Sequence, residues 1–268
     1  MRTHSSLLLL NLSLTLLPPD AGAQTPDVSA ANDRGAAIAR EADARDSGWG
    51  NAEARLRMVL KNRHGQESLR TLDVRFLEMA QDGDKSLGYF HEPADVKGTA
   101  LLTYSHKTES DDQWLYLPAL KRVKRIASAD KSGAFMGSEF AYEDLSSQEV
   151  EKYTYTHVKD EALDGEDCFV IERVPTAKYS GYTRQVVWID KSAYRTRKVD
   201  YYDRKGSLLK TLTAGGYTVH LERYWRAGWM LMQNHQNGKS TRLEWSGFRF
   251  QAGFKDTDFT QEALKRAS

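Results

Sequence analysis

The stretch from Gln113 to Leu145 constrains the fold of this chain more than any other. Its first five residues, QWLYL, put bulky apolar side chains on both faces of an extended strand, so neither face can lie against water. Pro118 follows directly and has no backbone N–H to donate, so the strand must end or reach a sheet edge there. We therefore expect a sheet that is covered on both sides at this strand.

The second part of the stretch has the composition of a loop that covers an apolar surface. Residues 127–133 are small or polar, and aromatic and methionine side chains follow among acidic ones. Met is an adaptable contact for an irregular apolar ligand. This order predicts a concave sheet with a flap over its mouth, which is the shape of a binding protein rather than of an enzyme. The expected cavity and flap contacts are Trp114, Leu115, Tyr116, Leu117, Phe135, Met136 and Phe140. Ordinary core packing is the alternative for the aromatic residues and Met136, and it is the favoured interpretation for Trp114 and Tyr116.

Between these parts lies the most concentrated charge in the chain, Lys121, Arg122, Lys124 and Arg125. One interpretation is a cationic rim that meets phosphate headgroups or an acidic partner. The other is a polar strand face that forms weak ion pairs with the flap, each worth about 0–1 kcal/mol if exposed. The acids for such a latch are Glu139, Glu143 and Asp144.

The N-terminus has the pattern of a cleaved secretory signal peptide over residues 1–23. Arg2 gives a positive start, residues 7–17 form an apolar segment, and Ala21-Gly22-Ala23 is a small-residue cleavage site. Because no Cys follows this site directly, we expect an exported, periplasmic protein that is not itself lipidated. The remainder, 24–268, has the size of a single domain.

Composition and motifs exclude several function classes. The formal net charge of +1 gives no field that attracts nucleic acid. The single cysteine, Cys168, cannot form an internal disulfide, and we expect it to be a small buried strand residue. The histidines are scattered without metal-ligand spacing, and Ser138 lacks the second glycine of a nucleophile elbow. We therefore expect no cofactor, no metal site and no catalytic residues, although a site assembled from distant strands stays open.

Most of the chain alternates apolar and polar residues with a period of two. Turn signals such as Asp164-Gly165 recur every 8–14 residues, which predicts about a dozen short strands in an antiparallel sheet that curls into a barrel or sandwich. A helix is expected over 34–46, capped by Asp33, and a short one over 261–266. Gly247 stands where the alternation changes phase and predicts a β-bulge.

Several of these segments resemble the bacterial outer membrane lipoprotein-sorting proteins, within the superfamily of LolA, LolB and RseB. The resemblance covers most of the mature chain. Its motifs are GWG at 48–50, PADVKGTALL at 93–102, QWLYLPALKRV at 113–123, FMGSEF at 135–140 and YED at 142–144.

This resemblance implies an unclosed antiparallel half-barrel with helices and a loop over its concave face and an apolar cavity between them. The chain is longer than LolA and shows fewer helices, so we expect a smaller lid. The implied function is a monomeric, non-enzymatic carrier of lipoprotein acyl chains or lipid. The alternative is a periplasmic sensor or accessory module that docks on an inner-membrane transporter or an anti-sigma factor. A hydrolase ranks third.

Overall fold

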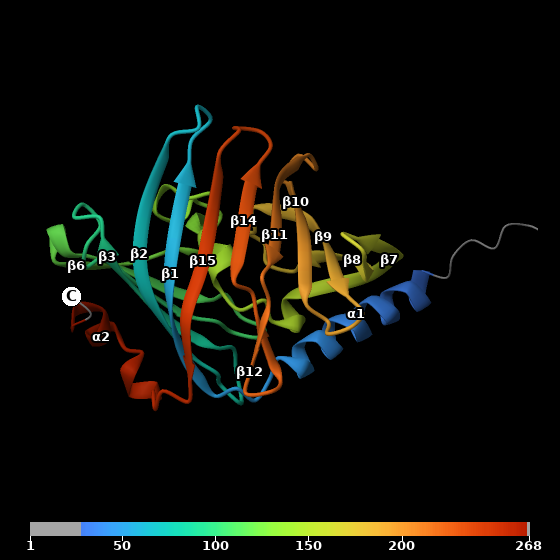
Figure 1. Ribbon diagram of the computed structural model, residues 1–268, viewed down its shortest axis with the longest axis horizontal. Coiled ribbons are helices and arrows are strands. Elements are labelled where there is room, and N and C mark those ends of the chain that lie inside the picture. The colour runs from blue at the N-terminus through green and yellow to red at the C-terminus, as the bar shows by residue number, and fades with distance from the viewer. Residues whose placement is uncertain (1–27, 267–268) are drawn as a thin grey trace, which may run out of the picture.

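One large antiparallel sheet of 13 strands forms the body of the molecule (Figure 1). The computed structural model describes residues 28–266, so the expected signal peptide lies outside the described residues. The strand order is β6-β5-β4-β3-β2-β1-β15-β14-β11-β10-β9-β8-β7. The two edge strands, β6 and β7, do not pair with each other. The expected fold class, an unclosed antiparallel half-barrel with an N-terminal helix, is confirmed.

The strands lie close to the positions that the alternation predicts. Their bounds are β1 Asn51–Lys61, β2 Glu67–Leu77, β3 Lys85–Glu92, β4 Ala100–Tyr104, β5 Asp112–Leu117, β6 Arg122–Arg125, β7 Tyr153–Leu163, β8 Glu166–Pro175, β9 Tyr182–Asp190, β10 Thr196–Asp203, β11 Leu208–Gly215, β14 Trp229–Asn234 and β15 Ser240–Phe250. A separate hairpin consists of β12 Thr218–His220 and β13 Tyr224–Arg226.

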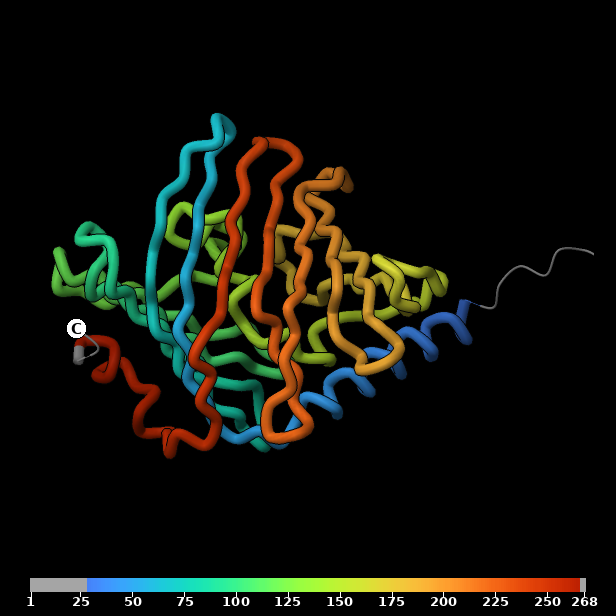
Figure 2. The backbone as a smooth tube through the Cα atoms, in the orientation of Figure 1, coloured from blue at the N-terminus to red at the C-terminus, as the bar shows by residue number. Residues whose placement is uncertain are grey.

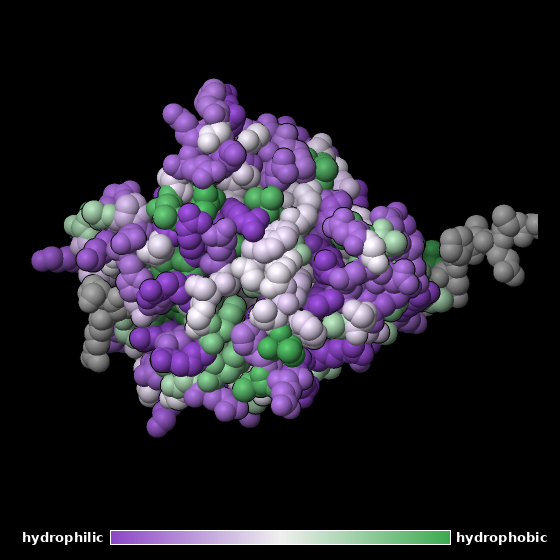
Figure 3. Space-filling model, viewed as in Figure 1, coloured by the Kyte–Doolittle hydropathy of each residue, from purple (hydrophilic) through white to green (hydrophobic). Residues whose placement is uncertain are grey.

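The central strands show how period-two alternation produces the curved sheet. On β1, Leu56 and Met58 are buried on the concave face, whereas Arg55 and Arg57 point outward. Arg55 forms an ion pair with Asp73 of β2, with 2.9 Å between Nε and Oδ1. This outer face is coloured mostly hydrophilic in Figure 3. The concave face is thus the apolar one, and whatever covers it decides whether it holds a core or a cavity.

Two local irregularities were readable in the sequence. Asp164 and Gly165 both have positive φ, at 50° and 83°, as a tight hairpin turn requires. The register between β1 and β15 shifts between Glu53 and Arg55, opposite Gly247, whose φ is 63°. The bulge expected at Gly247 is therefore confirmed.

Helix α1 (Val28–Arg45) packs against β7 and continues the wall of the half-barrel (Figure 1). Ile38 and Ala39 are buried in the main core cluster. Gly35 permits this approach, because a Cβ there would lie 2.7 Å from the backbone of Thr156. Asp33 lies inside the helix and not at its start, so the expected N-cap is wrong.

The segment between β6 and β7, residues 126–152, crosses the concave face and is called the flap below. Figure 2 shows it behind the central strands. It has no regular strand or α-helix and contains four 3₁₀ turns, Ser128–Asp130, Phe135–Gly137, Tyr142–Leu145 and Val150–Lys152. Its end at Lys152 leads directly into β7.

The C-terminal tail, residues 251–266, covers the other face of β3–β5. It ends in α2 (Gln261–Arg266), which confirms the expected short helix. Phe259 and Leu264 are fully buried there against Leu87 and Leu102. Tyr104 also donates a hydrogen bond from its hydroxyl to the carbonyl of Phe259. Both faces of β5 are therefore covered, as its sequence requires.

Candidate ligand cavity

A cavity of about 1050 Å³ lies between the concave sheet, α1 and the flap. This volume is at the upper end of the roughly 300–1,000 Å³ of small-molecule sites. The flap therefore spans the concave face without filling the space beneath it.

The deep wall of this cavity is apolar. It is built by inward-facing side chains of the central strands, by the flap and by strands β8 and β9. Gly88 of β3 also faces it and leaves room that a side chain would occupy. The apolar residues of this deep wall include Leu56, Met58, Leu72, Val74, Phe76, Leu101, Phe135, Phe140, Leu145, Val150, Ile171, Val187, Ile189, Met230, Leu243 and Trp245.

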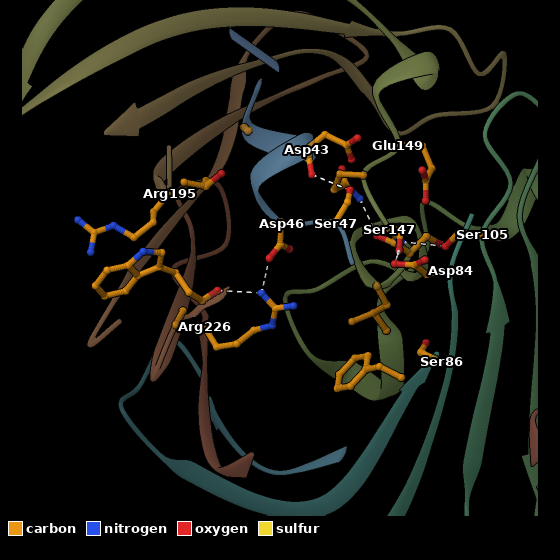
Figure 4. A pocket seen from close by; sticks show the side chains of 18 of the residues that line it. Asp43, Asp46, Ser47, Asp84, Ser86, Ser105, Ser147, Glu149, Arg195 and Arg226 are labelled. Atoms are coloured by element: carbon orange, nitrogen blue, oxygen red, sulfur yellow. Dashed lines mark hydrogen bonds and ion pairs between the residues drawn. The ribbon is translucent and has the colours of Figure 1, made fainter. Parts of the chain in front are cut away.

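The polar lining gathers at the end of α1 and along the neighbouring loops (Figure 4). Asp43 and Asp46 come from the last turn of α1 and its end, Asp84 from the approach to β3, and Glu149 from the flap. Burial raises the pKa of all four carboxyls above their ordinary values. An Arg226 guanidinium meets Asp46, with 2.5 Å between Nη1 and Oδ1.

Asp84 has the most perturbed carboxyl of this group. Burial raises its pKa to about 7, and the nearby charges of Glu149 and Glu78 act in the same direction. The backbone N–H of Met79 donates to Oδ1 at 3.1 Å, and the Ser147 hydroxyl donates to Oδ2 at 3.4 Å. Asp84 therefore connects the flap to the β2–β3 loop. With a pKa of about 7, its carboxyl gains or loses a proton near neutral pH.

The GWG turn joins α1 to β1 and closes one side of the cavity. The N–H groups of Gly48 and Gly50 donate to the two carboxylate oxygens of Glu78, at 2.6 and 2.7 Å. Trp49 is buried in a cluster with Ala52 and Tyr224 and also lines the cavity. Trp49 therefore fills the junction between the helix and the sheet.

A row of polar side chains crosses the concave face beneath the flap, and we call it the polar row. Its residues lie opposite one another on six neighbouring strands, β7, β8, β9, β10, β11 and β14. They are, in order, Tyr155, Arg173, Gln185, Tyr201, Lys210 and Asn234. All except Arg173 are buried. The row therefore gives this half of the concave face side chains that can form directed bonds, as Gln113 and Thr241 do on the other half.

A buried ion pair attaches the flap to the polar row. Lys210 Nζ donates to Asp144 Oδ2 at 2.6 Å, and both side chains are only 4% exposed. Asp144 also accepts from the Tyr182 hydroxyl at 2.8 Å and from the N–H of Ala141 at 2.6 Å. The carbonyl of Glu139 receives a second bond from Lys210, at 2.9 Å. These partners satisfy a charge that would otherwise be costly to bury.

The two other acids of the expected latch are held by the sheet and by the loop before β9. Glu139 Oε2 accepts from Asn234 Nδ2 at 2.7 Å. Glu143 accepts from the N–H of Gly181 and from the Ser180 hydroxyl, both at 2.8 Å. The flap is therefore fixed at several separate points, and not by weak surface pairs.

The cationic segment lies elsewhere. Lys121 occupies a left-handed turn, with φ of 48°, and Arg122, Lys124 and Arg125 are exposed on edge strand β6. Arg125 pairs with Asp112 of the adjacent strand. Within residues 28–266 none of the four cations forms an ion pair with a flap acid, so the expected latch does not fit the structure. Their role with headgroups or a partner stays a prediction.

The predicted apolar contacts divide between the two faces of the sheet. Leu115 is buried in the main cluster on the concave side, with Leu117 packed against that cluster. Trp114 and Tyr116 pack on the opposite side against the C-terminal tail. Alternate residues of a strand face opposite sides, so these two cannot reach the cavity. None of the four β5 residues lines it.

The flap residues fit the expectation better. Phe135 and Phe140 are buried and line the cavity. Phe135 also contacts Phe90 and Tyr142, at 5.8 and 5.6 Å between ring centroids. Met136 packs at the margin of the main cluster, outside the cavity lining.

Sequence reasoning missed the polar row. Its local signal is a polar residue on an otherwise apolar strand face, as for Gln185 beside Val187 and Ile189. A single such residue does not reveal its cross-strand neighbours.

Two other kinds of feature, a membrane-spanning helix and a metal site, have no counterpart in residues 28–266. Among the described helices, none combines the length and apolarity that crossing a membrane requires. No group of three or more His, Cys, Asp or Glu side chains in residues 28–266 is arranged to hold a metal ion. Cys168 is fully buried and unpaired on the outer face of β8.

Known proteins share this architecture. A solved structure from Vibrio parahaemolyticus, described as an outer membrane lipoprotein-sorting protein domain, is 57% identical, with a TM-score of 0.87. The match covers 88% of this chain and 100% of that one. The chain belongs to the outer membrane lipoprotein-sorting protein family. The resemblance seen in the sequence motifs is thereby confirmed.

Two further solved structures are similar to this chain. A protein of family DUF1329 from Desulfovibrio piger is 31% identical over 87% of this chain and 99% of its own, with a TM-score of 0.83. A LolA superfamily protein from Nitrosomonas europaea is 20% identical over 85% and 97%, with a TM-score of 0.69, and shares the fold. A family model described only as an uncharacterized protein matches residues 82–266. A comparison with curated proteins gave no match.

Proposed function

We propose that this protein is a periplasmic carrier that binds the acyl chains of lipoproteins or lipids in its concave cavity. The observation that carries the proposal is the apolar cavity of about 1050 Å³ between the sheet and the flap. Membership of a family named for lipoprotein sorting supports the same ligand class. The expected signal peptide supports export to the periplasm.

The energetics of such a carrier are set by the membrane that it takes its cargo from. Moving one 16-carbon chain out of water is worth about 12 kcal/mol, at about 0.8 kcal/mol per CH₂. A chain that leaves a bilayer has already gained this energy, so the cavity needs only to match the bilayer closely. A wall of Leu, Met, Val and Phe side chains provides such an environment.

The arrangement of the flap supports this function as well. It is held by hydrogen bonds and ion pairs at a few positions, including Asp144 and Glu143. Together with the packing of Phe135 and Phe140, these tethers hold the cover in place while the space between them stays unfilled. The cavity can therefore stay open to an apolar chain without unfolding the cover.

Native mass spectrometry of the mature protein, purified from the periplasm without detergent, tests the proposal. We expect a mass above that of the polypeptide, and lipid extraction should release an acylated species. A purely apo mass, with no uptake after incubation with liposomes, would contradict the carrier function.

A further inference from the structure

The two cations of the polar row have different surroundings. Lys210 meets the Asp144 carboxylate at 2.6 Å and is neutralised by it. Arg173 has neutral partners: Nε donates to Gln185 Oε1 at 2.8 Å, and Nη2 donates to Gln148 Oε1 at 3.2 Å. Within the described part of the chain, no carboxylate lies within ion-pair distance of Arg173.

Arg173 also lines the cavity. It lies on β8 two residues after Ile171, on the same face, and both are lining residues. Its guanidinium carbon is 4.6 Å from the ring centroid of Tyr153, which holds the side chain from one side. The guanidinium is thus a fixed, uncompensated positive charge at the edge of an apolar space.

The nearby carboxylates are occupied elsewhere. Glu143 binds Ser180 and Gly181, and Asp144 binds Lys210 and Tyr182. Burial raises the pKa of Glu149, next to Gln148, and the charges of Lys152 and Lys107 lower it. No internal acid therefore takes the position that a ligand oxygen would need in front of Arg173.

We propose that Arg173 binds the acyl oxygen of the cargo, so that the cavity selects acyl carbonyl or carboxylate compounds over plain alkyl chains. This rests on the proposed acyl-chain binding. Nε and one N–H of Nη2 bond Gln185 and Gln148, so the ligand oxygen would bind at Nη1 and the second N–H of Nη2, whose planar geometry suits a carboxylate or carbonyl oxygen. Two chemically related sources provide that oxygen, a free fatty acid and an acyl ester.

Binding of three 16-carbon probes at pH 7.5 tests the inference on the mature protein: palmitate, methyl palmitate and hexadecan-1-ol. The wild type should bind palmitate at least about tenfold more tightly than hexadecan-1-ol, because a hydrogen bond to a charged group adds to the burial of the chain. Stronger retention of methyl palmitate than of the alcohol would identify an ester as an accepted source. Equal binding of all three probes would overturn the inference without any mutation.

Arg173→Met keeps the length of the side chain and removes its charge. It should weaken palmitate binding by about tenfold to a hundredfold and leave hexadecan-1-ol binding within about twofold. Arg173→Lys retains a charge and should keep part of the preference for palmitate. Arg184→Met is the matched control, since Arg184 lies on the neighbouring strand but points outward to Glu172, with 3.0 Å between Nη1 and Oε2.

The outcomes separate this inference from the proposed function. Equal weakening of palmitate and hexadecan-1-ol by Arg173→Met would mean that Arg173 only fixes the flap through Gln148, and the inference would fail. If the wild type binds none of the three probes, the proposed function fails with it. If Arg173→Met does not fold, the wild-type preference for palmitate over hexadecan-1-ol and its size in the Arg173→Lys variant still decide whether Arg173 binds the acyl oxygen.

Discussion

The sheet is covered in two different ways on its two faces. On the outer face of β3–β5 the C-terminal tail packs directly on the strands, and Phe259 and Leu264 are fully buried. On the concave face the flap is held by bonds such as Asp144–Lys210 and leaves a cavity of about 1050 Å³. Apolar strands alone therefore do not decide whether a face becomes core or cavity; the segment that covers the face decides it.

The largest expected effect comes from breaking the flap's buried ion pair. Lys210→Met leaves the Asp144 carboxylate buried without its cation, which should lower the free energy of unfolding by about 3–5 kcal/mol. Lys191→Met removes a partly exposed pair with Asp160 and should cost about 0–1 kcal/mol. Urea unfolding measures both. Similar small losses for the two variants would mean that the flap is held in some other way.

Removing a packed side chain of the tail tests the other cover. Phe259→Ala deletes a fully buried ring and should lower the free energy of unfolding by about 3–5 kcal/mol. Palmitate binding by the folded fraction should stay unchanged, because the tail lies on the face opposite the cavity. A loss of binding with normal stability would contradict the separation of the two faces.

The buried carboxyl of Asp84, in the polar lining of the cavity, should make the free energy of unfolding depend on pH. The folded protein holds the Asp84 proton up to about pH 7, whereas an unfolded Asp releases it near pH 4. The free energy of unfolding should therefore fall as the pH rises from about 4 to about 7, by on the order of 2–4 kcal/mol from this group.

Asp84→Asn removes this titration and isolates its contribution from the other buried acids. Urea unfolding at pH 5 and pH 8 should show a smaller difference for the variant than for the wild type. An identical pH dependence would mean that Asp84 is not the responsible carboxyl.

The smallest effect concerns the cavity volume itself. A Cβ at Gly88 would lie 3.5 Å from Leu72 Cδ1, which is ordinary contact. Gly88→Leu should therefore fold and extend into the cavity. Displacing about two methylene groups of the ligand would weaken palmitate binding by about tenfold. Gly88→Ala is the control and should bind almost as the wild type does, as measured by isothermal titration. Unchanged binding by Gly88→Leu would place the ligand elsewhere.

Much of the fold was predictable because strand alternation and turn chemistry are local. The bulge at Gly247, the turn at Asp164-Gly165 and the helix over 261–266 all follow from short segments. Strand β5 is apolar on both faces, which requires that both faces be covered, and the flap and the C-terminal tail cover them. Its sequence could not say that the tail, more than 130 residues later, takes the face of Trp114 and Tyr116.

Of the cavity residues, only those within the flap could be predicted from the sequence, because they lie close together in the chain. Phe135 and Phe140 stand out in a small-residue loop and line the cavity. The polar row depends on the register of six strands, and single-sequence patterns do not give register between distant segments. For the same reason the flap acids could be recognised as a group, but their partner Lys210, 66 residues after Asp144, could not.

A crystal structure with 16-bromohexadecanoic acid would show directly whether the cavity holds an acyl chain, because the anomalous signal of bromine locates the end of the chain. We expect the bromine inside the cavity, against the apolar wall near Leu72 and Met58, and the carboxylate at Arg173. A bromine position outside the cavity, or no bound ligand at saturating concentration, would contradict the account.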